Sequence, residues 1–204
     1  MTESRPPLPP PTGPRSPAGS IALVVRWLAP LSALLTVLFA DTAGAAVMML
    51  VCLATTIMWR ARLPAALEVT TNLVLLVAAW SSVFLLYERL AHWDLVVHCA
   101  ATAVLAELAF RALERWGRLR APSAVAHVTV VTGLGAVLAL LWEFVEFAGY
   151  ALVDPRVEVG YLDTMGDLAA GCVGSLVIGA LGYWARQREG TPARVPAGAA
   201  EETR

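Results

Sequence analysis

Long apolar stretches alternate with short polar connections along this chain, and no polar face recurs within the stretches. The six stretches lie at about residues 21–40, 43–59, 67–87, 94–111, 124–149 and 164–185. A helix needs about 20 residues to cross ~30 Å of hydrocarbon, so these stretches have the length of membrane spans. A helix in lipid is apolar all round, which accounts for the missing polar face. The pattern predicts an all-α, polytopic membrane helix bundle of about six transmembrane helices.

Polar segments of a different composition flank the predicted bundle. Residues 1–20 hold seven prolines together with Ser and Gly, and residues 187–204 have a similar polar character. Such segments bury too little apolar surface to offset the entropy lost on ordering. We therefore expect disordered tails at 1–20 and 187–204 around a membrane domain at 21–186. Arg26 and Pro30 interrupt a long first apolar core, which favours a retained anchor over a cleaved signal peptide.

Composition narrows the classes of protein further. Hydrophobic residues make up 58% and charged residues 15% of the chain, whereas soluble domains carry roughly 25% charged residues. The three cysteines lie in apolar runs without a C-x-x-C spacing, and no basic face offers a nucleic-acid surface. The sequence also lacks a nucleophile elbow, a P-loop and a dinucleotide fingerprint. The composition thus argues against a compact water-soluble protein, and a nucleic-acid-binding protein and these enzyme classes are set aside.

Arginine placement predicts the orientation of the bundle. Thirteen of the fifteen arginines fall on one side of the predicted spans, and only Arg89 and Arg156 fall on the other. Short cytoplasmic loops are enriched in Lys and Arg, so we expect an inner-membrane protein with both termini in the cytoplasm. The opposite, periplasmic side carries nine acids and a local charge of −7: Asp41, Glu88, Asp94, Glu143, Glu146, Asp154, Glu158, Asp163 and Asp167.

Three predicted helices bring acids and one imidazole to the same depth on this side. The motif WDLVVH places Asp94 and His98 one turn apart, WEFVEF does so for Glu143 and Glu146, and DTMGD contributes two more acids. Carboxylate oxygens with a His nitrogen suit Zn or Mn, and oxygens alone suit Mg. We therefore predict a divalent-metal site at this end. The predicted metal ligands are His98, Glu143, Glu146, Asp163 and Asp167. The predicted catalytic groups are Glu143, Glu146 and Asp94, of which Asp94 acts by orienting His98.

Structural roles are open alternatives for part of this set. Asp94 is a candidate helix N-cap, and Asp163 is another for the last span. Glu143 and Glu146 fit a structural role less well, because the helix dipole disfavours negative charge in the last turns of a helix. At the cytoplasmic ends we expect Glu68, Glu107 and His127 to form interfacial pairs with arginines: Glu107 is too far round its helix to share the outer site.

Small residues in the last predicted span indicate close helix packing. Gly171, Ser175 and Gly179 form one ridge beside Ala170 and Gly174, a spacing that lets membrane helices approach closely. Such packing draws Asp163 and Asp167 towards a neighbouring helix. The turn-rich segment 153–162 has the composition of a lid over the outer mouth.

The segments WEFVEF and DTMGDLAAGCVG, with Asp94 and His98, resemble the YjdF-like bacterial inner-membrane proteins over about residues 87–182. That family is uncharacterised, and Met165 stands where its motif often has Gln. More distantly the chain resembles the VanZ-like membrane proteins, although Leu95 and Glu146 depart from their pattern. Some VanZ-like proteins are linked to glycopeptide tolerance, so the resemblance implies work at the cell envelope.

Three functions follow from the predicted cluster. The first is a metal-dependent enzyme that acts on a phospholipid or a polyprenyl phosphate. The second is a non-catalytic scaffold whose polar cluster locks helices together, and the third is a cation or proton transporter, which the lack of a carboxylate at the bilayer midplane makes less favourable. Membrane lipids are the expected partners, nucleic acid is excluded, and a homo-oligomer remains an alternative to a monomer.

Overall fold

The computed structural model describes residues 17–39, 42–121, 123–153 and 159–189, and within these ranges the chain forms helices and no strand. Six helices in this part of the chain are long and apolar enough to cross a membrane: α1 (Pro17–Phe39), α2 (Thr42–Ala61), α3 (Ala65–Val83), α5 (Trp93–Arg115), α6 (Ala124–Leu152) and α7 (Tyr161–Glu189). The predicted all-α bundle with six spans is confirmed. The predicted tails lie mostly outside the described residues, and their described parts, 17–20 and 187–189, belong to α1 and α7.

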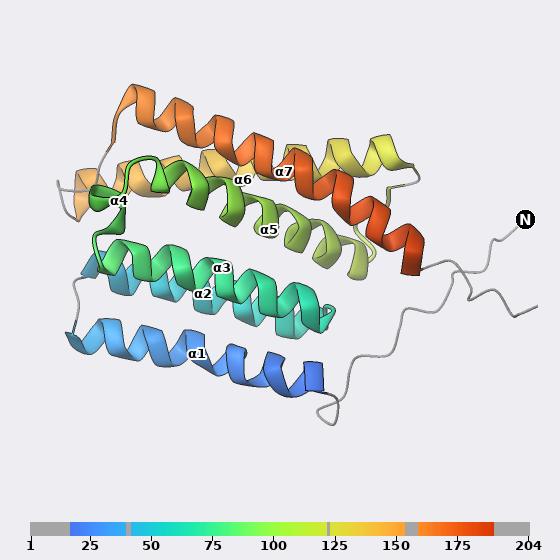
Figure 1. Cartoon of the computed structure of the whole chain (residues 1–204), viewed down its shortest axis with the longest axis horizontal. Coiled ribbons are helices and arrows are strands. Elements are labelled where there is room, and N and C mark those ends of the chain that lie inside the picture. Colours follow the sequence, from blue (N-terminus) through green and yellow to red (C-terminus); the bar gives the residue numbers. More distant parts are fainter. Residues whose placement is uncertain (1–16, 40–41, 122, 154–158, 190–204) are drawn as a thin grey trace, which may run out of the picture.

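The six helices run alternately up and down (Figure 1). The start of α1, the end of α7, the connection at 62–64 and the residues 116–121 after α5 lie at one end of the bundle. We call it the arginine-rich end, because it carries Arg60, Arg62, Arg111, Arg115, Arg118 and Arg120. The starts of α5 and α7 and the end of α6 lie at the other end, which we call the carboxylate end. Helices α5 and α7 therefore run in the same direction, and α6 runs against both.

Helix α5 joins two packed groups of helices. Buried side chains of α1, α2 and α3 form one apolar cluster, which also includes Leu108 of α5. A second cluster consists of Ala106 and Phe110 of α5 with Val131 of α6. Figure 1 shows α5 between the layer of α1 to α3 and the layer of α6 and α7. α5 thus lies between the two groups of helices.

The third span ends earlier than the apolar pattern predicts. The prediction extended it to residue 87, but α3 ends at Val83 and a separate short helix, α4 (Leu86–Arg89), follows. Leu85 between them has φ 56°, a left-handed conformation that stops an α-helix. The apolar run continues through this turn, so hydrophobicity alone did not locate the break.

Close packing of α5 against α7 depends on glycine. A Cβ atom on Gly174 would lie 2.0 Å from the carbonyl oxygen of Cys99, and one on Gly171 would lie 3.1 Å from Oγ1 of Thr102. Without these Cβ atoms the two backbones come into near contact, as the ridge of small residues predicted. The first half of α7 is therefore held against the first half of α5.

Candidate metal centre

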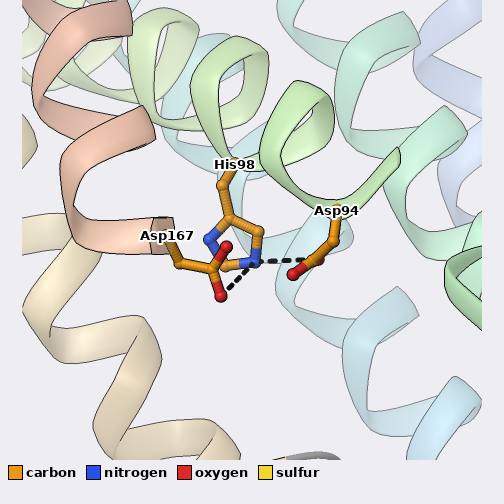
Figure 2. Close-up of side chains that lie close together, drawn as sticks. All are labelled: Asp94, His98 and Asp167. Carbon is orange, nitrogen blue, oxygen red and sulfur yellow. Dashed lines mark ion pairs between the residues drawn. The ribbon is translucent and has the colours of Figure 1, made fainter. Parts of the chain in front are cut away.

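Helix α5 supplies an aspartate and a histidine that face each other. The helix begins at Trp93 and its N-cap is His92, which makes no side-chain cap bond. Asp94 is therefore not the N-cap, and that structural alternative is wrong. Its Oδ1 instead lies 3.3 Å from Nε2 of His98, one turn further along (Figure 2).

Asp167 of α7 approaches the same imidazole nitrogen from the other side. Its Oδ2 lies 3.8 Å from Nε2 of His98 (Figure 2). The residue is only 2% exposed, and its other oxygen, Oδ1, is buried without a hydrogen-bond partner among the described residues. One ligand atom from each of Asp94, His98 and Asp167 can be chosen so that all three lie within 4.8 Å of one another. Two carboxylates thus flank one ring nitrogen.

Helix α6 adds two glutamates to Asp167. Glu143 and Glu146 are half-buried, whereas Phe144 and Phe147 between and beside them are exposed. Ligand atoms of Glu143, Glu146 and Asp167 also lie within 4.8 Å of one another, and Oε1 of Glu143 is buried without a hydrogen-bond partner in the described chain. Asp167 is common to both groups.

We call these five residues, Asp94, His98, Glu143, Glu146 and Asp167, the carboxylate cluster. All five belong to the set of site residues that the sequence predicts, and the structure brings them together from three helices. The sixth, Asp163, lies one turn before Asp167 and belongs to neither group. α7 begins at Tyr161, before Asp163, so this acid is within the first turn rather than at the cap position. The central part of the predicted lid, residues 154–158, lies outside the described residues.

Negative charge dominates the cluster. Four carboxylates face a single imidazole, and Arg89, the one arginine in the described part of this end, is exposed. The starts of α5 and α7 direct their positive dipole ends to this region, which offsets only part of that charge. Buried carboxylates must be paired, protonated or bound to a metal. The cluster therefore has to take up cations, either as protons or as a metal ion.

The spacing of the atoms suits a metal ion. Zinc lies about 2.0–2.2 Å from nitrogen and oxygen ligands, which puts two ligands of a tetrahedral ion about 3.3–3.5 Å apart. The distances from Nε2 of His98 to the two aspartates, 3.3 and 3.8 Å, are close to this separation. The ring of Trp142 lies edge-on to that of His98 at 6.5 Å between centroids and adds an apolar wall. These separations are compatible with the geometry of a divalent ion.

Tyr87 is a neighbour of the cluster that the sequence did not identify. It lies on α4, between the spans, and its hydroxyl donates to the backbone oxygen of Ala78 at 2.9 Å. Burial, and then the nearby carboxylates of Asp94, Glu146 and Asp167, raise the pKa of Tyr87 above its ordinary value. Its short helix carries no motif, so no sequence signal pointed to it.

The Tyr87 phenol is expected to stay protonated well above pH ~10, where an exposed tyrosine ionises. In the unfolded chain it ionises at that ordinary pH, so the free energy of unfolding should fall as the pH rises past ~10. Ultraviolet titration of tyrosinate in the wild type and in Tyr87→Phe measures this directly. An ionisation near pH ~10 that disappears in the variant would contradict the prediction.

The acids at the arginine-rich end form the predicted ion pairs, but their partners are arginines within the helices. Nε and Nη2 of Arg26 on α1 donate to the two oxygens of Glu68 at 2.7 and 2.9 Å. Glu107 on α5 pairs with Arg111, and its Oε2 lies 3.6 Å from Nε2 of His127 on α6. Glu107 thus lies near one end of α5 and His98 near the other, as predicted.

Comparison with known families adds one assignment. A family model described as "Predicted membrane protein (DUF2238)" matches residues 18–188, which include all six spans and the carboxylate cluster. The chain belongs to this family. The DUF2238 assignment agrees with a membrane protein but assigns no reaction to it. No curated protein and no solved structure is significantly similar to the chain.

Proposed function

We propose that this DUF2238 protein is a metal-dependent membrane enzyme that acts on the phosphate group of a lipid, either a phospholipid or a polyprenyl phosphate. One observation carries the proposal: Asp167 is buried, leaves one oxygen without a hydrogen bond, and is shared by two groups of ligand atoms. A buried carboxylate in this condition is stabilised by a cation. In the scaffold alternative a proton would have to take the place of the metal at this carboxylate.

Two sets of ligands support the metal site. Asp94, His98 and Asp167 provide nitrogen and oxygen atoms that suit Zn or Mn, and Glu143 and Glu146 with Asp167 provide oxygens that suit Mg or Mn. The position of Asp94 beside Nε2 of His98 favours a ligand role over the orienting role expected from the sequence. Bound there, a divalent ion supplies neutralisation of phosphate charge and activation of water.

The surroundings of the cluster favour a lipid substrate. Phe144 and Phe147 lie on α6 next to the two glutamates and are exposed, at 60% and 58%. In a membrane these rings contact acyl or prenyl chains while the neighbouring carboxylates lie near the headgroup region. A phosphate on such a chain reaches the cluster without leaving the bilayer.

The arginine distribution supports a cytoplasmic arginine-rich end and hence a cluster at the periplasmic leaflet of the inner membrane. The resemblance to the YjdF-like and VanZ-like proteins, which rests on the same motifs, supports a role in the cell envelope. The substrate would then be a lipid of that leaflet.

Metal analysis of the detergent-purified protein tests the proposal. We expect at least one Zn, Mn or Mg ion per chain, and a loss of bound metal in Asp167→Asn. Asp163→Asn is the matched control, because this acid lies on the same helix but in neither ligand group, and it should keep its metal. Equal metal contents in wild type and Asp167→Asn would refute the metal site.

Activity separates the enzyme from the other functions. Hydrolysis of the phosphate ester of a phospholipid or of a polyprenyl phosphate should require the metal and should be lost in Asp167→Asn. Metal binding without turnover, accompanied by cation flux into proteoliposomes that Glu143→Gln abolishes, would instead identify a transporter.

A further inference from the structure

A polar cavity lies at the arginine-rich end, at the opposite end of the bundle from the carboxylate cluster. It has a volume of about 220 Å³ and lies among the start of α1, the end of α2 and the start of α3. Its charged and aromatic lining consists of Arg26, Trp59, Arg62 and Glu68. We call it the arginine pocket.

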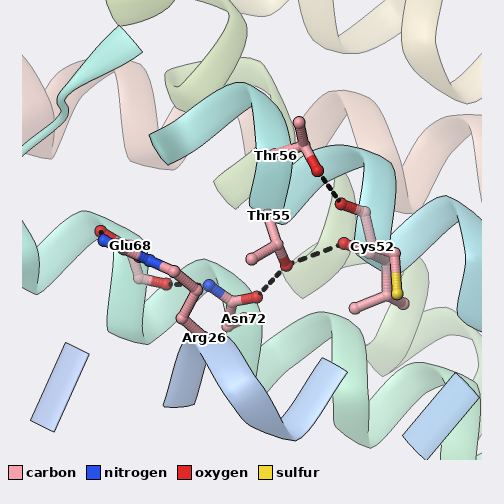
Figure 3. Close-up of polar contacts among 7 residues, drawn as sticks. Arg26, Cys52, Thr55, Thr56, Glu68 and Asn72 are labelled. Carbon is pink, nitrogen blue, oxygen red and sulfur yellow. Dashed lines mark hydrogen bonds and ion pairs between the residues drawn. The ribbon is translucent and has the colours of Figure 1, made fainter. Parts of the chain in front are cut away.

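The pocket carries a net positive charge. The fork of Arg26 is bound to both oxygens of Glu68, which is 4% exposed, so this pair is neutral overall (Figure 3). A guanidinium has five N–H donors, and the pair with Glu68 uses two of them. Arg62 has no ion-pair partner in the described part of the chain and adds a full charge. The pocket thus contains the unpaired charge of Arg62 and N–H groups of Arg26 that are not used by Glu68.

The backbone turns at Arg62, where α2 has ended. The residue directly follows α2 and has a left-handed conformation with φ 50°. The amide of Leu63 donates to the carbonyl of Met58 at 3.4 Å across it, the arrangement in which helix ends usually have glycine. An arginine is less favourable than a glycine in this conformation. This turn directs the chain past the cavity, and Arg62 lines it.

Tryptophans place the pocket at the depth of lipid headgroups. Trp59 lines the cavity and is 58% exposed, and Trp27, one residue from Arg26, is also exposed. Exposed tryptophans are enriched where a membrane meets water. The cavity therefore opens at the membrane surface, where phosphates of the lipids lie.

We propose that the arginine pocket binds the phosphate of an anionic phospholipid from the leaflet at the arginine-rich end. Arginine forks match the oxygens of a phosphate, and basic pockets between spans are suited to acidic headgroups. The single excess positive charge matches the single negative charge of a phosphodiester. This site is independent of the metal site and of its proposed chemistry.

Lipid-dependent thermal stability tests the proposal. The detergent-purified protein is titrated with phosphatidylglycerol, with phosphatidylcholine, or with inorganic phosphate. We expect phosphatidylglycerol to raise the melting temperature at concentrations where the other two do not. In Arg62→Gln its apparent affinity should fall about fivefold, the effect of removing one arginine from an acidic headgroup.

Two variants make the test specific. Arg60→Gln removes a charge two residues away that does not line the cavity, and it should respond as the wild type does. Arg62→Gly removes the side chain together with the backbone cost, so it should melt no lower than the wild type without lipid and still lose the response. An unchanged affinity in Arg62→Gln, an equal loss in Arg60→Gln, or an equal response to inorganic phosphate would overturn the proposal.

Discussion

Replacing Gly174 with alanine is expected to lower the free energy of unfolding by about 3 kcal/mol and to remove metal from the carboxylate cluster. The added Cβ would lie 2.0 Å from the carbonyl oxygen of Cys99, a backbone atom that cannot rotate away. Overpacking costs ~1–3 kcal/mol where side chains can adjust, and here α7 itself has to move from α5. Asp167 moves with it, away from His98.

Thermal unfolding and metal content of Gly174→Ala, both measured in detergent, check this prediction. Gly133→Ala is the matched control, because no atom lies within 4 Å of the Cβ it would add. That substitution in α6 should stabilise the helix by about 0.5–1 kcal/mol and leave the metal bound. Wild-type behaviour of Gly174→Ala would mean that the α5–α7 contact is wrongly placed.

Removing the metal should reverse the order of stability of the wild type and Asp167→Asn. With metal at a thousand times its dissociation constant, binding stabilises the wild type by about 4 kcal/mol. Asp167→Asn loses most of this gain and should melt lower. In a chelator the wild type keeps uncompensated buried carboxylates, whereas the variant has one fewer, so the variant should melt at the same temperature or higher.

Melting curves of the two proteins with added metal and with EDTA measure this reversal. A purely structural cluster gives another result: Asp167→Asn melts below the wild type in both conditions, and EDTA has no effect on either protein. Protons, rather than a metal, would then hold the carboxylates together.

The sequence predicted the number and the type of the helices because lipid imposes a length and a composition on every span. It predicted the helix ends less well. The apolar run through Phe84 and Leu85 looked like the end of a span, but Leu85 adopts a left-handed turn. Hydropathy measures the free energy of transfer into lipid and does not depend on backbone dihedral angles. It therefore could not predict the turn at Leu85.

For the cluster, helical spacing placed Asp94 and His98 on one face, and likewise Glu143 and Glu146. Whether these faces meet depends on how α5, α6 and α7 pack against one another. The glycines of α7 indicated close packing but not which helix α7 packs against. Spacing also treated Asp163 and Asp167 alike, and only the packing of α7 distinguishes them. Tyr87 lies close to the cluster because its chain segment turns back there, a tertiary effect without a local pattern.

The order of the proposed ligands along the chain has a consequence for biogenesis. Asp94 and His98 are on α5, the glutamates follow on α6, and Asp167 is on α7, the last helix described. During synthesis the earlier helices enter the bilayer first, so the proposed metal centre would be incomplete until the final span has been inserted beside α5. A nascent protein halted before that point would hold no ion, and metal loading would report that insertion is finished.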